Sequence, residues 1–118
     1  MRVLFVRGYN ENGTPLTLGT VLQYTGSAYA ITSPYNYDNS SKYKVLYDKV
    51  WTLSSGAGVT GSTPARCLRI SKKLGHEIQW SANTTTVLDG GLCVFFISDV
   101  SLNPPSVQYQ TRVYFTDA

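Results

Sequence analysis

The sequence predicts an all-β fold, an antiparallel β-sandwich or barrel with one short helix. Short apolar runs rich in Val, Ile, Tyr, Phe and Trp recur between clusters of Gly, Pro, Asn and Ser. Several of these runs alternate apolar and polar residues, the period of a half-buried strand. A length of 118 residues fits one domain, and no long internal linker divides the chain. We therefore expect a single domain over residues 1–118.

The first two strands are predicted at residues 2–7 and 43–53. The first, Arg-Val-Leu-Phe-Val-Arg, is nearly apolar throughout, which is typical of an inner strand covered on both faces. Turn-forming residues 8–13 end it. The second alternates over eleven residues. One face would carry Tyr43, Val45, Tyr47, Lys49, Trp51 and Leu53, and the other Lys44, Leu46, Asp48, Val50 and Thr52.

One helix is predicted between these strands. Thr14 is a suitable N-cap, Pro15 suits the first helical position, and apolar residues follow at helical spacing as far as Gln23. Gly19 weakens the pattern, so we expect one or two turns. The Gly- and Ser-rich residues 54–63 are predicted to form a surface loop.

Four further strands are expected in the second half of the chain. Residues 66–72 alternate and are predicted to form a hairpin with residues 77–81 through a turn at Gly75. Residues 92–98, the most hydrophobic stretch, are predicted to form a central strand in the core. Residues 109–116 alternate again and follow a Pro-Pro pair, so the chain is expected to end in a strand.

The composition favours a protein that associates with itself. Charged residues make up 14% of the chain, against about 25% in an average soluble domain. The surface left by such a sequence is rich in Tyr, Ser, Thr, Asn and Gly, which suits a subunit that buries much of its exterior against copies of itself. The net charge of +3 is mild and is no nucleic-acid signal by itself. No apolar run is long enough for a transmembrane helix, so no membrane partner is expected.

Motifs for catalysis, cofactors and metals are absent from the sequence. The single histidine, His76, adjoins a predicted turn, and the seven carboxylates form no motif for paired acid and base chemistry. No Gly-rich phosphate-binding motif precedes a helix. Cys67 and Cys93 are expected to be buried thiols in a reduced compartment, with a disulfide between them as the alternative. We expect neither an enzyme nor a bound cofactor or metal.

Two sets of residues are candidates for binding. Tyrosines in loop-like sequence offer large rigid contact area with a polar tip, and a charged residue inside the long strand suggests an ion pair across a subunit boundary or a strand-edge hydrogen bond. The candidate interface residues are Tyr24, Tyr29, Tyr35, Tyr37 and Asp48. Basic residues on two predicted strands and at their ends could instead meet phosphates. The candidate nucleic-acid contacts are Lys42, Lys44, Arg66, Arg69, Lys72 and Lys73.

The long predicted strand carries Lys-Val-Leu-Tyr-Asp-Lys at residues 44–49, followed by an aromatic residue and Thr-Leu. It is preceded by residues 2–7, Asn-Gly-Thr-Pro at 12–15 and Ser-Pro-Tyr-Asn at 33–36. It is followed by Ile-Ser-Lys-Lys-Leu at 70–74, Ile-Gln-Trp at 78–80, and an ending Arg-Val-Tyr-Phe-Thr-Asp-Ala. In this order of segments the whole chain resembles capsid proteins of small circular single-stranded DNA viruses, the circovirus-like group and its relatives with satellite-necrosis-virus-like shells.

The resemblance implies a jelly roll whose copies form an icosahedral T=1 shell of roughly sixty subunits around circular single-stranded DNA. It also implies a virion protein that assembles in the host nucleus or cytoplasm. Family members carry an arginine-rich arm and two further strands before the segment that matches residues 2–7. We therefore expect the chain to correspond to the last two-thirds of such a protein, an incomplete jelly roll with six of eight strands.

Two other classes of function were weighed against the capsid subunit. A monomeric β-sandwich module could bind carbohydrate by stacking sugars on Trp51, Trp80 and the loop tyrosines. A cupin-like enzyme would need a cluster of His and carboxylate ligands, which one histidine cannot supply.

Overall fold

The computed structural model describes residues 1–26, 29–52, 67–82, 85–99 and 106–115. Strands β1 (Arg2–Gly8), β2 (Tyr43–Val50) and β5 (Leu92–Ile97) form one antiparallel sheet in the order β2-β1-β5. Strands β3 (Gln79–Trp80) and β4 (Val87–Asp89) form a second, two-stranded antiparallel sheet. One four-residue helix, α1 (Leu18–Val21), and a 3-10 turn, η1 (Tyr37–Asn39), are the helical elements of the described ranges. The predicted all-β class with antiparallel sheets and one short helix is confirmed.

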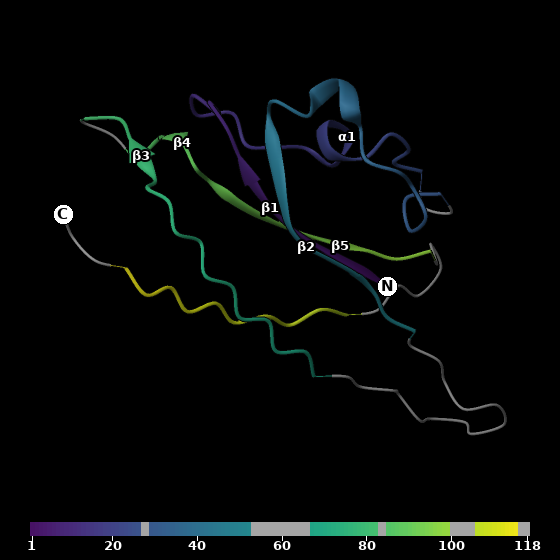
Figure 1. Ribbon diagram of the computed structural model, residues 1–118. Coiled ribbons are helices and arrows are strands. Elements are labelled where there is room, and N and C mark those ends of the chain that lie inside the picture. The colour runs from purple at the N-terminus through teal and green to yellow at the C-terminus, as the bar shows by residue number, and fades with distance from the viewer. Residues whose placement is uncertain (27–28, 53–66, 83–84, 100–105, 116–118) are drawn as a thin grey trace, which may run out of the picture.

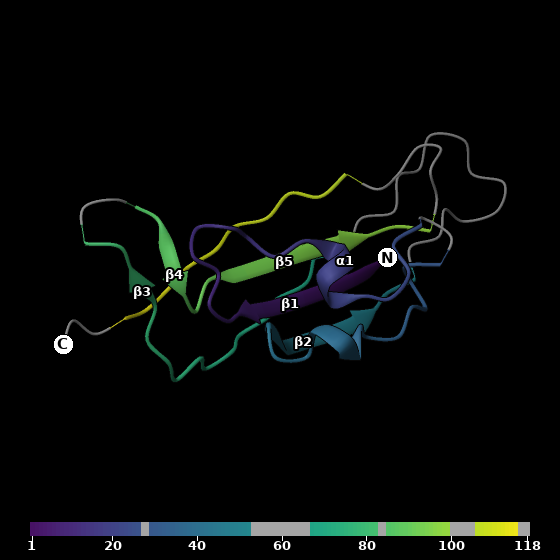
Figure 2. The same ribbon diagram turned by 90° about the horizontal axis from the view of Figure 1, so that it is seen from above.

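The three-stranded sheet has loops and helix on one side and extended chain on the other. Figure 1 shows α1 and its flanking loops above the sheet, and residues 67–78 and 106–115 running below it. Figure 2, from above, shows α1 over the sheet near β1. We call the upper side the helix-side face and the lower side the opposite face. No helix in the described ranges has the length and apolarity needed to cross a bilayer.

The core lies between the helix-side face and α1. Leu4 and Val6 of β1 are fully buried against Val21 and Leu22. Tyr43 and Ile97, from the two flanking strands, and Ala30 complete the cluster. Since alternate residues of a strand share a face, Arg2, Leu4 and Val6 point to the helix-side face and Val3, Phe5 and Arg7 to the opposite one. Both Val3 and Leu4 are buried, which confirms the prediction that β1 is an inner strand.

A β-bulge in β2 changes its predicted face pattern. The register passes from Phe5 opposite Tyr47 to Val6 opposite Val45, so Leu46 has no partner on β1. Asp48 lies opposite Leu4 and therefore shares the helix-side face with Val45. The strict alternation that put Val45, Tyr47 and Lys49 on one face is wrong because one extra residue exchanges the faces beyond the bulge.

Other predictions of secondary structure need correction. Residues 67–72 form no strand, and the partner of β3 is β4, so the hairpin of residues 66–72 with 77–81 is wrong. The predicted central strand 92–98 is β5, which pairs only with β1 in the described chain and is an edge strand. Residues 109–115 form no ladder. The helix begins after Thr17 rather than Thr14.

One predicted turn and both cysteines can also be compared with the structure. Gly75 has a φ of +62°, which fits the predicted turn. Both cysteines are free thiols, but Cys67 is exposed and Cys93 half-buried, so the expectation of two buried thiols is wrong for Cys67. The predicted loop at 54–63, Leu53, Arg66 and Thr116 lie outside the described residues.

Candidate subunit interface and nucleic-acid face

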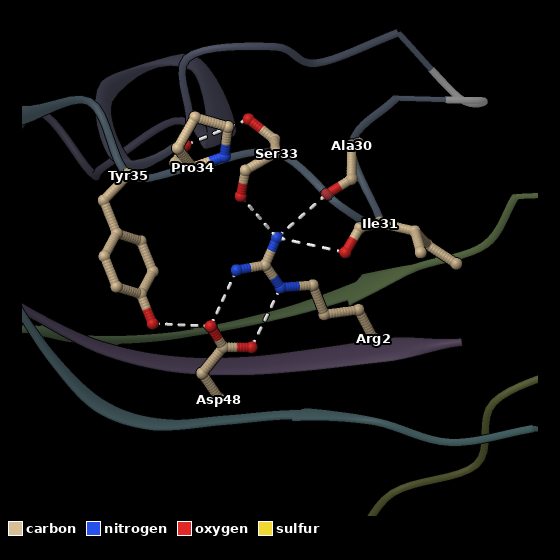
Figure 3. A network of polar contacts seen from close by, with 7 residues as sticks. All are labelled: Arg2, Ala30, Ile31, Ser33, Pro34, Tyr35 and Asp48. Carbon is tan, nitrogen blue, oxygen red and sulfur yellow. Dashed lines mark hydrogen bonds and ion pairs between the residues drawn. The ribbon is translucent and has the colours of Figure 1, made fainter.

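A buried arginine joins the first strand to the second. Arg2 is only 6% exposed, and its guanidinium lies on the helix-side face of β1. Its Nε donates to Asp48 Oδ1 at 2.9 Å and its Nη2 to Asp48 Oδ2 at 2.7 Å, a bidentate ion pair across β1 and β2 (Figure 3). Bidentate charge-assisted bonds fix both distance and orientation. The pair therefore sets the position of the guanidinium above the sheet.

The remaining nitrogen of Arg2 ties a loop to the sheet. Nη1 donates to three main-chain carbonyls: to Ser33 at 2.8 Å, Ala30 at 3.1 Å and Ile31 at 3.2 Å. Figure 3 shows these oxygens converging on one nitrogen from the segment above the strands. Buried carbonyls without a hydrogen-bond donor destabilise the fold, so Arg2 supplies the donor that this irregular segment does not find in a strand or helix. We call residues 29–37 the clamped loop.

Tyr35 completes the network from within the clamped loop. Its hydroxyl donates to Asp48 Oδ2 at 2.5 Å. Burial, followed by the hydrogen bond to Asp48, raises the pKa of Tyr35 to about 12. The hydrogen bonds from Arg2 lower the pKa of Asp48, against the smaller opposing effect of burial. The carboxylate is thus held ionised and shared by an arginine and a phenol.

The predicted interface tyrosines divide into one anchor and three exposed side chains. Tyr24, Tyr29 and Tyr37 are 54%, 70% and 73% exposed. Tyr35 is half-buried and already hydrogen-bonded within the chain. The Tyr35 and Tyr37 rings meet edge to face, with centroids 6.5 Å apart. The clamped loop therefore presents exposed phenols on a backbone fixed from below, an arrangement suited to protein contact.

Asp48 is paired within the chain. An ion pair across a subunit boundary was one alternative, but the described chain satisfies Asp48 internally through Arg2 and Tyr35. Arg2 was not predicted as the partner of Asp48. A charged residue at the start of an inner apolar strand could have indicated an ion pair, because a buried charge needs a partner.

The opposite face of the sheet carries positive charge. Arg7 of β1 lies directly opposite Lys44 of β2, and Val3 lies opposite Lys49. Three cations stack on aromatic rings: Lys49 on Trp51 at 4.7 Å, Arg7 on Tyr9 at 4.9 Å and Lys72 on Tyr47 at 5.7 Å. The carboxylate of β2, Asp48, points to the other face. We call Arg7, Lys44, Lys49 and Lys72 the basic face.

Only part of the predicted nucleic-acid set belongs to the basic face. Lys44 and Lys72 do, and Lys42 is exposed just before β2, where its carbonyl accepts from Tyr9 N at 2.8 Å. Arg69 and Lys73 are exposed on the irregular segment 67–78, and Arg66 lies outside the described residues. Arg7 and Lys49 were not predicted to belong to this set. Arg7 follows Val3 and Phe5 at every second position, and Lys49 follows Tyr47 in the same way, so the strand period could have placed them on one face.

The basic face has features that favour a bound anion. Like charges directly opposite each other on paired strands repel, as Arg7 and Lys44 do here. Arg7 Nε is also buried without a hydrogen-bond partner in the described chain. Phosphate groups would neutralise the like charges of Arg7 and Lys44.

The remaining polar groups of the described chain form no metal site, and comparison with known proteins found no match. His76 contacts the carbonyls of Leu74 and Gly90 at 3.2 and 3.3 Å. Within the described ranges, no three His, Cys, Asp or Glu side chains gather as a metal site would require. No protein-family model, curated protein or solved structure matches the chain.

Proposed function

We propose that the protein is a structural subunit of a viral capsid that self-associates into an icosahedral shell around circular single-stranded DNA. The observation that carries the proposal is the set of large apolar side chains that the described part of the chain leaves exposed. Trp80 is 55% exposed, Val113 59% and Tyr114 84%. Large exposed apolar surfaces mark sites of protein contact. A subunit that buries these side chains against several neighbours accounts for them.

The aromatic members of this exposed set support the same function, because aromatic residues are enriched in protein interfaces. The most exposed of them are Tyr29, Tyr37, Tyr109, Tyr114 and Phe115, between 70% and 84% exposed. Three of these lie in residues 106–115 and two in or beside η1 and the clamped loop. Two separate regions therefore offer contact to neighbouring copies.

The basic face supports the nucleic-acid part of the proposal. It lies on the side of the sheet away from the clamped loop, so contacts made by the clamped loop and contacts with DNA use different sides of one subunit. A shell requires this separation, because its subunits touch one another while one surface faces the genome.

A monomeric carbohydrate-binding module has less support. Stacking of sugars needs aromatic rings around a concave site. Two hollows of the described chain, of about 470 and 290 Å³, are bordered by Arg2, Asp48 and residues 31–33 in one case and by Glu11, Cys93 and residues 85–87 in the other. No aromatic side chain lines either hollow, and Trp51 is covered by Lys49.

Electron microscopy with nuclease protection tests the proposal. The purified chain is mixed with circular single-stranded DNA, stained, and treated with nuclease. We expect closed particles that protect the DNA. The variant Tyr29→Ala/Tyr37→Ala should lose particles while keeping its circular dichroism spectrum, and Thr25→Ala, a change at another exposed position, should keep them. Absence of particles from the unmodified chain at all protein concentrations would refute the shell.

A further inference from the structure

We propose that residues 106–115 of one copy add as an extra strand to the free edge of β5 in a second copy. The proposal rests on the self-association proposed above and names one of its contacts. Such strand addition uses main-chain hydrogen bonds for affinity and alternating side chains for register.

The donor is a strand-like segment without a strand partner. Val107, Tyr109, Thr111, Val113 and Phe115 alternate with polar or larger side chains, which is the pattern of a β-strand. In the structure residues 106–115 are all exposed and form no ladder with another described segment. Val113 is 59% exposed, Tyr114 84% and Phe115 80%. The main-chain groups and the apolar side chains of this segment are thus both available.

The acceptor is an edge that lacks the usual protection. Natural edge strands carry charges, Pro or bulges that prevent further pairing. The outer edge of β2 has such features, since β2 contains Lys44 and Lys49 and is bulged at Leu46. Strand β5, Leu-Cys-Val-Phe-Phe-Ile, has no charge and no Pro, and in the described chain it pairs with β1 along one edge only. Val94 and Phe96 remain 40% and 38% exposed.

The contact within one chain leaves this edge free. The Tyr109 ring packs on the Phe96 ring with centroids 5.9 Å apart, and Phe96 points to the opposite face because it pairs with Val3. In the view of Figure 1 residues 106–115 run below the sheet rather than in line with it. The segment therefore lies near β5 without extending the sheet.

A second copy is the occupant that the surface favours. The described part of the chain contains both a donor and an acceptor, so copies can join head to tail, and a heterologous contact of this kind forms a ring where its rotation closes. The contact would also bury Val113, Tyr114 and Phe115, which one chain leaves 59%, 84% and 80% exposed.

Two blocked variants of the full chain test the inference by complementation. Gln110→Pro/Thr111→Pro removes two consecutive main-chain N–H groups, one of which must face an acceptor strand, and is called the donor-blocked variant. Val94→Lys places a charge on the acceptor edge and is called the acceptor-blocked variant. Gln110→Ala/Thr111→Ala and Val94→Thr are the matched controls. Circular dichroism checks that all four remain folded.

The mixture of the two blocked variants decides the question. A donor-blocked chain keeps its β5 edge, and an acceptor-blocked chain keeps its donor segment, so one contact can form between them. We expect a tagged donor-blocked chain to capture at least tenfold more acceptor-blocked chain than a second donor-blocked chain. Equal capture in both mixtures, or particles from the donor-blocked variant as abundant as those of the unmodified chain, would overturn the inference.

These results separate the inference from the proposed function. If the unmodified chain assembles and the donor-blocked variant assembles equally well, this contact is wrong and the capsid function stands. If the unmodified chain never assembles, the proposed function fails and the inference fails with it.

Discussion

Arg2 and Asp48, separated by 46 positions in the sequence, form the bidentate ion pair that joins β1 to β2 beneath the clamped loop. The arginine side chain is 7% exposed and the aspartate side chain 21%. Removal of one member leaves the other charge buried without its partner, which costs far more than the pair contributes as a whole. The ion pair therefore holds β1 against β2 and also fixes the loop that carries the proposed interface.

Asp48→Asn should lower the free energy of unfolding by about 3 kcal/mol, because Arg2 would remain buried without a counter-charge. Urea unfolding followed by circular dichroism measures the change. Arg2→Met/Asp48→Leu should lose less than Asp48→Asn, since the double change leaves no buried charge. An unchanged urea midpoint for Asp48→Asn would contradict this account of the network.

Acid should weaken the protein through Asp48. Hydrogen bonds from Arg2 hold the pKa of Asp48 below its ordinary value of 3.8, so the folded chain binds the proton less readily than the unfolded chain. The stability from this group is present above pH 4 and is lost as the pH falls through the lowered pKa. Unfolding midpoints between pH 5 and pH 2 should fall more steeply for the unmodified chain than for Asp48→Asn. Parallel curves would rule out the contribution.

Glu11 should change the stability with pH in the opposite direction from Asp48. Its carboxylate lies over the backbone of Gly8 and Gly91, where a Cβ added to Gly91 would come within 2.2 Å of Oε2. Oε1 is buried without a hydrogen-bond partner in the described chain, and burial, then the charge of Asp89, raises the pKa of Glu11. The folded state thus favours the protonated acid, and stability is lost as the pH rises from about 4.5 through the raised pKa.

Glu11→Gln should therefore unfold at a higher urea concentration than the unmodified chain at pH 7, with a smaller difference at pH 4. Glu77→Gln is the matched control, because Glu77 is exposed. A lower midpoint for Glu11→Gln at pH 7 would show that the carboxylate stabilises the turn.

Tyr35 should be among the last tyrosines to ionise. Burial and the hydrogen bond to Asp48 raise its pKa to about 12. The folded protein therefore keeps this phenol protonated to a higher pH than the unfolded chain does. Ultraviolet titration of phenolate absorbance should contain a late phase near pH 12 that Tyr35→Phe removes. Tyr37→Phe, which changes an exposed ring, should leave that phase in place.

DNA binding by the basic face should depend on salt. Each phosphate contact to a single strand contributes about 0.7 to the slope of log affinity against log salt. The triple change Lys44→Gln/Lys49→Gln/Lys72→Gln should therefore reduce the magnitude of this slope by about 2. Filter binding with single-stranded DNA at several salt concentrations measures it. Arg112→Gln removes one charge outside the basic face and should leave the slope nearly unchanged.

The sequence was most informative where periodicity and packing agree. The apolar run at residues 2–7 predicted an inner strand, and Val3, Leu4 and Val6 are buried in β1. The alternation that begins at Tyr43 predicted β2, but it could not reveal the bulge at Leu46, which depends on pairing with β1. Asp48 consequently faces the side of the sheet on which Arg2 lies.

Strand pairing between segments far apart in the sequence could not be predicted from local patterns. Residues 67–72 and 109–115 alternate as strands do, but strand formation also requires pairing with a neighbouring edge, and neither segment pairs with another described segment. For the same reason Arg2 was overlooked. Its three carbonyl partners lie 28 to 31 residues away, in a loop whose path no periodicity predicts.

The solution mass of the unmodified chain, measured by light scattering on a sizing column over a range of protein concentrations, tests self-association most directly. The account predicts particles of many chains of 13.0 kDa each, in equilibrium with smaller species at low concentration. A folded monomer of 13.0 kDa at every concentration would contradict the account.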